Sequence, residues 1–400
     1  MKTFFGFIFF RDFALVYPVY VIFFEQQGLD YRQISMLLAV WAVAALLSEV
    51  PAGVVADAWS RKGVLVVAMV LKAVGFIVWL AYPQAPGFAV GFILWGLQEG
   101  FSTGVSEAWL YDALQADDQA ERFVELSGRS GLYQRLAVAL SVLFGGVVFS
   151  FSVAAVMITS AASMGISGVC AALLPEKRPH RDASFVAAQT LGAIAATVRE
   201  AARIPRFIPL IFFTALGLVT YGIMDEYDFL IGAGYGVPVA LIGLWGGARF
   251  LLEGLGSAMA HRMHWLNPER NPGMIAAWIA GAGMLLIPVG LLQRVFLVPL
   301  YFLFYLLMAA AEVIIQGWIQ DRVSSEGRAT VASVVSFAYE LVGLGLLLLS
   351  GIVMQRRGLH GFILAAGITV LVSALGVFWA FGRSTAPIEG AEEHQDGIDL

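Results

Sequence analysis

The sequence predicts an all-α membrane protein in which twelve transmembrane helices form two pseudo-symmetric six-helix bundles. Three observations lead to this fold class. Of the 400 residues, 59% are hydrophobic and 13% are charged, whereas about 25% of residues are charged in a soluble protein. The chain also divides into apolar runs of roughly 20 residues, the length that crosses a bilayer. Finally, polar landmarks of the first half recur in the second half.

The apolar runs place the helices in chain order. The first six runs cover 4–25, 33–55, 63–82, 87–114, 127–150 and 152–174. The second six cover 207–232, 238–260, 273–291, 296–320, 329–354 and 359–382.

The boundaries of these runs predict the domain organisation. We expect one bundle over 1–174, a cytoplasmic linker over 175–206 and a second bundle over 207–382. The linker is either passive or contains an amphipathic helix that lies in the membrane interface. The acidic tail over 383–400 is expected to be disordered.

The distribution of Lys and Arg predicts the orientation, because cytoplasmic loops carry an excess of these residues. The connections on one side include the basic clusters at 61–62, 177–181 and 199–206. The connections on the other side carry only Arg32, Arg294, Arg356 and Arg357. We therefore expect both termini in the cytoplasm and the protein in the cytoplasmic (inner) membrane.

Matching landmarks indicate an internal repeat. Glu49 and Asp57 end the second run, and Glu253 and His261 repeat their spacing at the end of the eighth. The fourth and tenth runs both end in a W-x-x-D sequence. Several pairs in the same order favour a duplicated six-helix unit, as in transporters built from two related halves.

The short connection at 53–63, G-V-V-A-D-A-W-S-R-K-G, places an acid and two cations between two apolar runs. Gly53 is expected to let two helices approach closely, and the guanidinium of Arg61 can pair with a carboxylate. Asp112, at the end of the fourth run, is the natural partner. Together with Asp57 and Lys62, these residues form either a conformational latch or an ordinary helix-capping turn beside positive-inside charges.

Ionisable residues inside the runs are the candidates for transport chemistry, because charge is costly in a membrane. The seventh run carries Asp225, Glu226 and Asp228. Three carboxylates this close cannot all stay ionised at low cost, so at least one is expected to load and release a proton. The alternative is that water at the outer membrane face solvates the cluster.

Further polar side chains in the runs have helical spacing. Glu99 and Glu107 lie in the fourth run, Glu312 and Gln316 in the tenth, and Asp12 in the first. Such stripes line a cavity or make hydrogen bonds between helices.

The buried cations need partners. Arg135 is the expected counter-charge of the cavity acids, whereas Lys72 and Arg249 are expected to form structural ion pairs. Arg11 and Asp12 are adjacent and need not pair, because neighbouring side chains diverge on a helix.

No signature points to an enzyme, a metal site or a bound cofactor. Cys170 is the only cysteine, the five histidines are scattered at connections, and there is no nucleotide-binding P-loop. The modest net charge of -5 argues against a nucleic-acid partner. The expected partners are a small-molecule substrate, protons and lipids, and the protein is expected to be a monomer.

With its predicted spans, central linker and 53–63 connection, the chain resembles the major facilitator superfamily of secondary transporters. The segments S-E-A-W-L-Y-D at 106–112 and G-R-A-T-V-A-S at 327–333 resemble a bacterial branch labelled drug or metabolite efflux. The stretch G-L-Q-E-G at 96–100 lacks the Arg that proton-coupled drug antiporters carry there. The paired glycines at 145–146 likewise lack the proline of the antiporter motif.

This resemblance implies alternating access driven by the proton gradient. The excess of buried acids favours proton-coupled export of a cationic or amphipathic compound. One alternative is a symporter that imports a nutrient or an anionic metabolite through Arg11 and Arg135. Less favoured are a flippase-like protein that handles lipids and a membrane receptor that transports nothing.

Overall fold

A computed structural model of the chain describes residues 1–176, 207–268, 270–321 and 328–381, and these are all-helical. The predicted linker helix and the acidic tail lie outside the described residues. In the first half the helices are α1 (Lys2–Asp12), α2 (Tyr20–Gln26), α3 (Tyr31–Ala58), α4 (Arg61–Ala81), α5 (Ala85–Ala116), α6 (Phe123–Phe151) and α7 (Val153–Ala172). In the second half they are α9 (Phe207–Glu226), α10 (Asp228–Gly234), α11 (Ile242–Ala260), α12 (Pro272–Leu292), α13 (Val298–Asp321) and α14 (Arg328–Phe381).

Local sequence sets many of the helix starts. Asp30 and Gln33 form a capping box at the start of α3, and the Ser60 hydroxyl accepts a hydrogen bond from the Gly63 N–H at the start of α4. The last two predicted runs join into α14 around Gly358, whose φ of 69° is non-helical. Among the described residues, nine helical segments are long and apolar enough to cross a membrane.

The predicted first run is not one continuous helix, which corrects the expectation for 4–25. The chain leaves helical geometry after Asp12 and resumes it at Tyr20. Two of the freed backbone N–H groups are satisfied by side chains from distant helices: Ala14 donates to Ser141 Oγ at 2.9 Å, and Val16 donates to Ser160 Oγ at 3.2 Å. Such compensation is what allows irregular backbone within a membrane protein.

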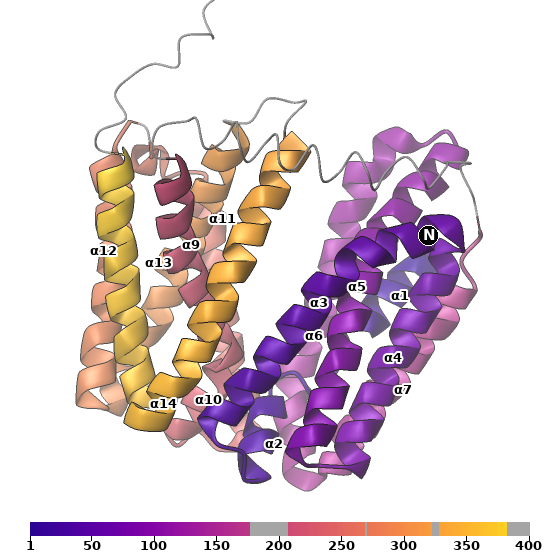
Figure 1. Cartoon of the computed structure of the whole chain (residues 1–400), viewed down its shortest axis with the longest axis horizontal. Helices are drawn as coiled ribbons and strands as arrows, with labels where there is room; N and C mark the ends of the chain where they lie inside the picture. Colours follow the sequence, from indigo (N-terminus) through magenta and orange to yellow (C-terminus); the bar gives the residue numbers. More distant parts are fainter. Residues whose placement is uncertain (177–206, 269, 322–327, 382–400) are drawn as a thin grey trace, which may run out of the picture.

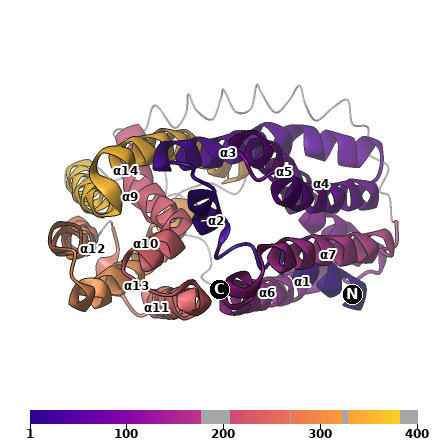
Figure 2. The same ribbon diagram turned by 90° about the horizontal axis from the view of Figure 1, so that it is seen from below.

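The predicted seventh run, 207–232, is also interrupted. Tyr227 separates α9 from α10. Thus the first helix of each half is broken, and the two short segments, α2 and α10, lie next to each other (Figure 2). Paired broken helices are the feature that positions binding groups in many transporters.

The helices of the two halves form two groups that meet at one end (Figure 1). There, a Cβ at Gly146 of α6 would clash with the carbonyl of Val239, and a Cβ at Gly351 of α14 would clash with Ser35 of α3. Glycine allows this close approach between helices. We call this end, where α2 and α10 also lie, the closed end. Towards the opposite end the two groups diverge (Figure 1).

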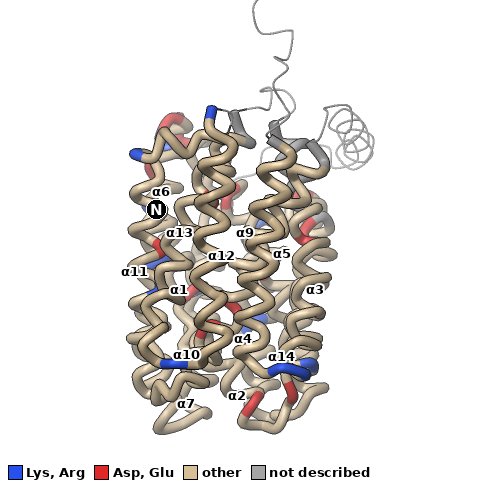
Figure 3. Tube along the Cα trace, turned by 90° about the vertical axis from the view of Figure 1, so that its left-hand side faces the viewer, with Lys and Arg blue, Asp and Glu red and all other residues tan. Residues whose placement is uncertain are grey.

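Charged residues gather mainly at the two ends of the helices, with a smaller set in the middle (Figure 3). This distribution follows from the high cost of charge in an apolar surrounding. The exceptions in the middle form the candidate site.

Candidate functional site

A cavity of about 580 Å³ opens between the two halves. On one side its walls come from the helices α1 to α6 and from the break between α1 and α2, and on the other side from α9, α10 and α11. The charged groups that line it are Arg11, Asp12, Lys72, Glu99, Glu107, Asp225, Glu226 and Arg249. The cavity thus has five carboxylates and three cations among its lining residues.

Four of the predicted cavity residues, Asp12, Glu99, Glu107 and Asp225, line this space. Asp228 does not: it is fully buried behind the wall. The polar pair of α13 also lies away from the cavity, where Gln316 Nε2 donates to Glu312 Oε1 at 3.1 Å.

Arg135 is exposed and does not line the cavity. The expectation that Arg135 neutralises the cavity acids therefore stays a prediction. The cavity cations are Arg11, Lys72 and Arg249.

On the wall formed by the first half, Arg11 and Asp12 form an ion pair with an N–O distance of 2.8 Å. Their pairing is possible because α1 ends at Asp12 and the chain turns away from helical geometry. The expectation that these neighbours need not pair holds for a continuous helix, which this segment is not. Arg11 also lies within 3.5 Å of Ser106 on α5, so the pair is anchored to the wall.

Lys72 is the least expected cation of the cavity. It is 3% exposed, and its ammonium donates to the Tyr17 hydroxyl at 2.9 Å and lies 4.6 Å from the Trp95 ring centre. Among the described residues, no carboxylate lies within ion-pair distance of its Nζ, so the predicted structural ion pair is wrong. Aromatic faces stabilise a cation through their quadrupole. The signal in the sequence was a single Lys in the middle of an apolar run.

On the opposite wall, one cation contacts three carboxylates. Arg249, 2% exposed at its side chain, forms ion pairs with Asp225, with Asp228 at 2.9 Å and with Glu253 at 2.9 Å. The structural ion pair that was expected of Arg249 is therefore present. We call Asp225, Asp228, Arg249 and Glu253 the Arg249 cluster.

Asp228 is the structural anchor of the Arg249 cluster. Its Oδ1 accepts hydrogen bonds from Trp245 Nε1 at 2.8 Å and from the Tyr301 hydroxyl at 2.7 Å. Its other oxygen, Oδ2, lies 2.9 Å from Arg249 Nε, so both oxygens of this buried carboxylate face donor groups. Asp225, 47% exposed at its side chain, is the carboxylate of the cluster that lines the cavity.

Between residues that the structure describes, two hydrogen bonds cross from one half to the other at the closed end, and both involve neighbouring residues at the α9–α10 break. The Tyr20 hydroxyl donates to Glu226, and the hydroxyls of Tyr227 and Ser35 share a hydrogen bond of 2.6 Å. Glu226 was recognised in the sequence as one of the three carboxylates of the seventh run, but its partner on α2 was not, because nothing in the local sequence relates the two segments.

At the other end of the first half, Arg61 contacts its predicted partner Asp112. It also lies 3.2 Å from Asp57 and donates to the Ala108 carbonyl at 2.7 Å. The predicted pairing is therefore present, while the latch role stays a prediction. Lys62 is half-buried in the first turn of α4.

A Cβ at Gly53 would meet nothing within 4 Å in this arrangement. Its role in close helix approach stays a prediction. The tight glycine contacts described above lie instead at the closed end.

Comparison with known proteins agrees with this architecture. The family model of the Major Facilitator Superfamily matches residues 3–345. A crystal structure of a mutant form of the nucleoside transporter NupG superposes with a TM-score of 0.75 at 16% identity, covering 95% of this chain and 98% of that chain. A bacterial homologue of the human lysosomal transporter Spinster, in an inward-facing and occupied conformation, gives a TM-score of 0.73 at 14% identity, with 94% and 95% covered.

Similarity to a curated sequence is more local. An uncharacterised MFS-type transporter, YxaM of Bacillus subtilis (strain 168), is 27% identical over 115 residues. The match spans 28% of this chain and 28% of that relative. Because the family model covers most of the sequence, the chain belongs to the Major Facilitator Superfamily, and the solved transporters share its fold.

Proposed function

We propose that the protein exports a small cationic or amphipathic organic compound across the cytoplasmic membrane, driven by the proton gradient. Twelve spans, with both termini in the cytoplasm, would form two bundles that rock about the cavity. No cofactor is needed, since the proton gradient supplies the energy. Because the divergent end faces the predicted cytoplasmic side, the arrangement of Figure 1 corresponds to an inward-facing state.

The observation that carries the proposal is the excess of carboxylates over cations, which is larger on the second-half side once the buried partners of Arg249 are included. On the first-half wall, the three carboxylates Asp12, Glu99 and Glu107 line the cavity beside Arg11 and Lys72. On the second-half wall, Arg249 is the only lining cation among the described residues, and it is already paired with the three carboxylates of its cluster. Glu226 adds a further acid to this wall. Excess negative charge in a low-dielectric site favours the uptake of a proton or of a cationic solute.

Aromatic side chains support an amphipathic solute. Tyr17, Trp41, Trp95, Phe229 and Phe250 line the same cavity. Aromatic faces attract organic cations and also bury apolar surface. A solute with a positive group and an aromatic or aliphatic body therefore matches the lining.

The test uses purified protein in liposomes with an imposed pH gradient and a panel of probes. The panel contains ethidium as the amphipathic cation, together with uridine, D-xylose and dialanine, which represent neutral and zwitterionic solutes. We expect ethidium movement against the direction of proton flow, lost when the gradient is collapsed. Movement of a solute in the same direction as protons would exclude export, and solute movement without proton movement would exclude coupling.

Lys72 favours a second candidate function, a proton-coupled importer of a nutrient or an anionic metabolite. It is a buried cavity cation without a carboxylate in ion-pair distance among the described residues. An anionic group could bind there. Benzoate added to the probe panel separates this candidate from export of cations.

A further inference from the structure

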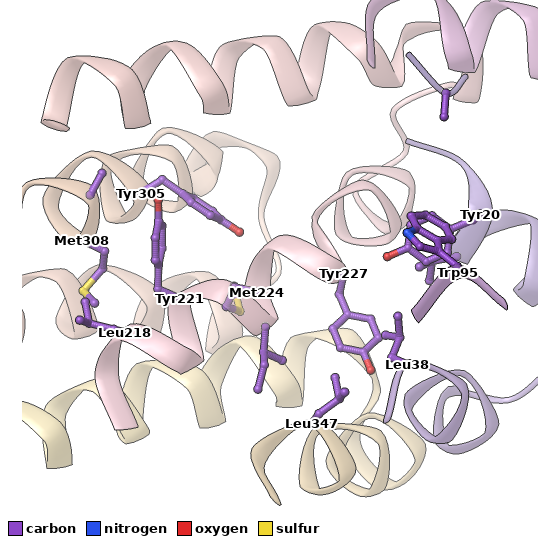
Figure 4. Close-up of a cluster of buried hydrophobic side chains, with 14 of the residues drawn as sticks. Tyr20, Leu38, Trp95, Leu218, Tyr221, Met224, Tyr227, Tyr305, Met308 and Leu347 are labelled. Atoms are coloured by element: carbon purple, nitrogen blue, oxygen red, sulfur yellow. The ribbon is translucent and has the colours of Figure 1, made fainter. Parts of the chain in front are cut away.

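Glu226 and Tyr227 occupy the break between α9 and α10, and each reaches across the closed end to the other half. Glu226 accepts from Tyr20 of α2, and Tyr227 bonds with Ser35 of α3. The Tyr227 ring is fully buried and lies between Leu38 of the first half and Leu347 of the second (Figure 4). Two consecutive residues thus tie together the ends of three helices from both halves.

The two hydrogen bonds across the closed end differ in one chemical property. Tyr227 and Ser35 are neutral hydroxyls, so their hydrogen bond keeps the same strength across the physiological pH range. Glu226 can carry either a charge or a proton. It also lines the cavity, so a proton can reach it while the closed end stays shut. The hydrogen bond between Tyr20 and Glu226 is therefore the one that pH can change.

We propose that Glu226 is the proton-binding residue that couples protonation to opening of the closed end, with the protonated form holding that end shut. This inference rests on the proposed proton-coupled transport and names the residue that performs the coupling. It also assigns Tyr227 a different task, that of a clamp whose strength does not depend on pH.

The direction of the pH effect on the closed end follows from the groups that surround Glu226. Asp225 precedes it on α9, Glu99 faces it from α5, Tyr20 donates from α2, and Tyr227 follows at the break. Among the residues of known placement, the cation that acts on Glu226 is Arg249 of α11, which is already shared by the three carboxylates of its cluster.

In the closed arrangement, an ionised Glu226 therefore lies near other acids and accepts a hydrogen bond from one hydroxyl group, that of Tyr20. That donor offsets only part of the cost of a charge removed from water. Opening the closed end would separate α2 from the α9–α10 break and let water reach the carboxylate. Protonation thus stabilises the closed arrangement, and loss of the proton favours opening.

The experiment measures the closed end directly in the full-length protein. Cys170→Ala removes the only native thiol, and spin labels are attached at Gln27→Cys and Arg356→Cys, which are exposed on opposite halves at the closed end. Double electron-electron resonance in lipid nanodiscs then gives the ratio of short to long distances. The pH is varied from about 5 to about 8, a range over which buried carboxyl groups titrate.

For the labelled protein with native Glu226 and Tyr227, we expect the ratio of closed to open molecules to fall about tenfold as the pH rises. This fall corresponds to a change of about 1.4 kcal/mol in the free energy of opening. Glu226→Gln, which mimics the protonated form, should stay closed with less than roughly a twofold change over the same range. Tyr227→Phe is the matched control: it should lower the ratio at every pH and keep the pH response.

Three results would overturn the inference: a pH response that survives in Glu226→Gln, a closed population that grows as pH rises, or the absence of any pH response in the parent. Because the labels report opening without a solute, the outcome is independent of the transport assay. A pH-dependent closed end without proton-driven transport would refute the proposed function and leave the role of Glu226 standing.

Discussion

Replacement of Arg249 by Met is the most demanding test of the charge arrangement. Arg249 is 2% exposed at its side chain and contacts Asp225, Asp228 and Glu253. The substitution keeps an apolar stem beside the Phe250 ring and removes the only cation of the cluster. Asp228, with 0% side-chain exposure, then becomes an uncompensated buried charge.

The size of the effect follows from that burial. Removing one partner of a buried ion pair costs about 3–5 kcal/mol. Since about 1 kcal/mol shifts the midpoint of thermal unfolding by about 2–4 °C in a domain of 150–250 residues, we expect a decrease of roughly 10 °C. The loss should be smaller at low pH, because protonation neutralises the carboxylates that Arg249 no longer pairs with, and it should grow as pH rises.

Thermal unfolding in detergent, followed by fluorescence-detected size exclusion, measures the shift. Arg129→Met is the matched control, because Arg129 forms an exposed pair with Glu125, with side-chain exposures of 57% and 43%. Exposed pairs contribute about 0–1 kcal/mol, so this variant should unfold near the parent temperature.

The double substitution Arg249→Met with Asp228→Asn should recover most of the loss, because Asn still accepts from Trp245 and Tyr301 without a charge. Equal effects of the Arg249 and Arg129 substitutions would refute the reasoning. So would a double variant that is less stable than Arg249→Met alone.

Three further outcomes are expected. Gly243→Ala places a Cβ against the α6 backbone and should shift spin-labelled protein towards the open arrangement, whereas Gly247→Ala, with nothing within 4 Å, should not. Asp112→Asn weakens the half-buried ion pair with Arg61, which contributes about 1 kcal/mol. The transport rate should therefore change severalfold while the affinity for ethidium stays constant. Loss of ethidium binding would place Asp112 in the cavity. Lys72→Met should keep proton-driven ethidium transport, because we expect the organic cation to bind at the second-half wall. Loss of ethidium transport in this variant would contradict that binding position.

The sequence was most informative about the helices themselves. Apolar runs locate them because bilayer thickness and helical rise constrain their length. It was less informative about continuity. The break after Asp12 is stabilised by Ser141 and Ser160, which belong to helices far along the chain. No local pattern in the first run can reveal those partners, so a single continuous span was predicted.

The site illustrates the same limit. Helical spacing identified Asp12, Glu99, Glu107 and Asp225, which do line the cavity. It did not distinguish Arg135, which is exposed, because the cavity-facing side of a span depends on how its neighbours pack.

Lys72 and Glu226 show which contacts a single helix cannot predict. The aromatic partners of Lys72 come from α5 and from the break before α2. The partner of Glu226 comes from the other half of the chain. In contrast, Arg61 and Asp112 were paired correctly, because each lies near the end of a helix on the same predicted side of the membrane.

The central claim is that the movements of the solute and of protons are coupled through the cavity. Its most direct test is the change in internal pH of liposomes that contain the protein and a trapped pH-sensitive dye, recorded as ethidium is added without an imposed gradient. The account predicts a proton movement that depends on ethidium and is lost in both Asp225→Asn and Glu226→Gln. Ethidium transport that produces no change in internal pH, or a change that both variants retain in full, would contradict it.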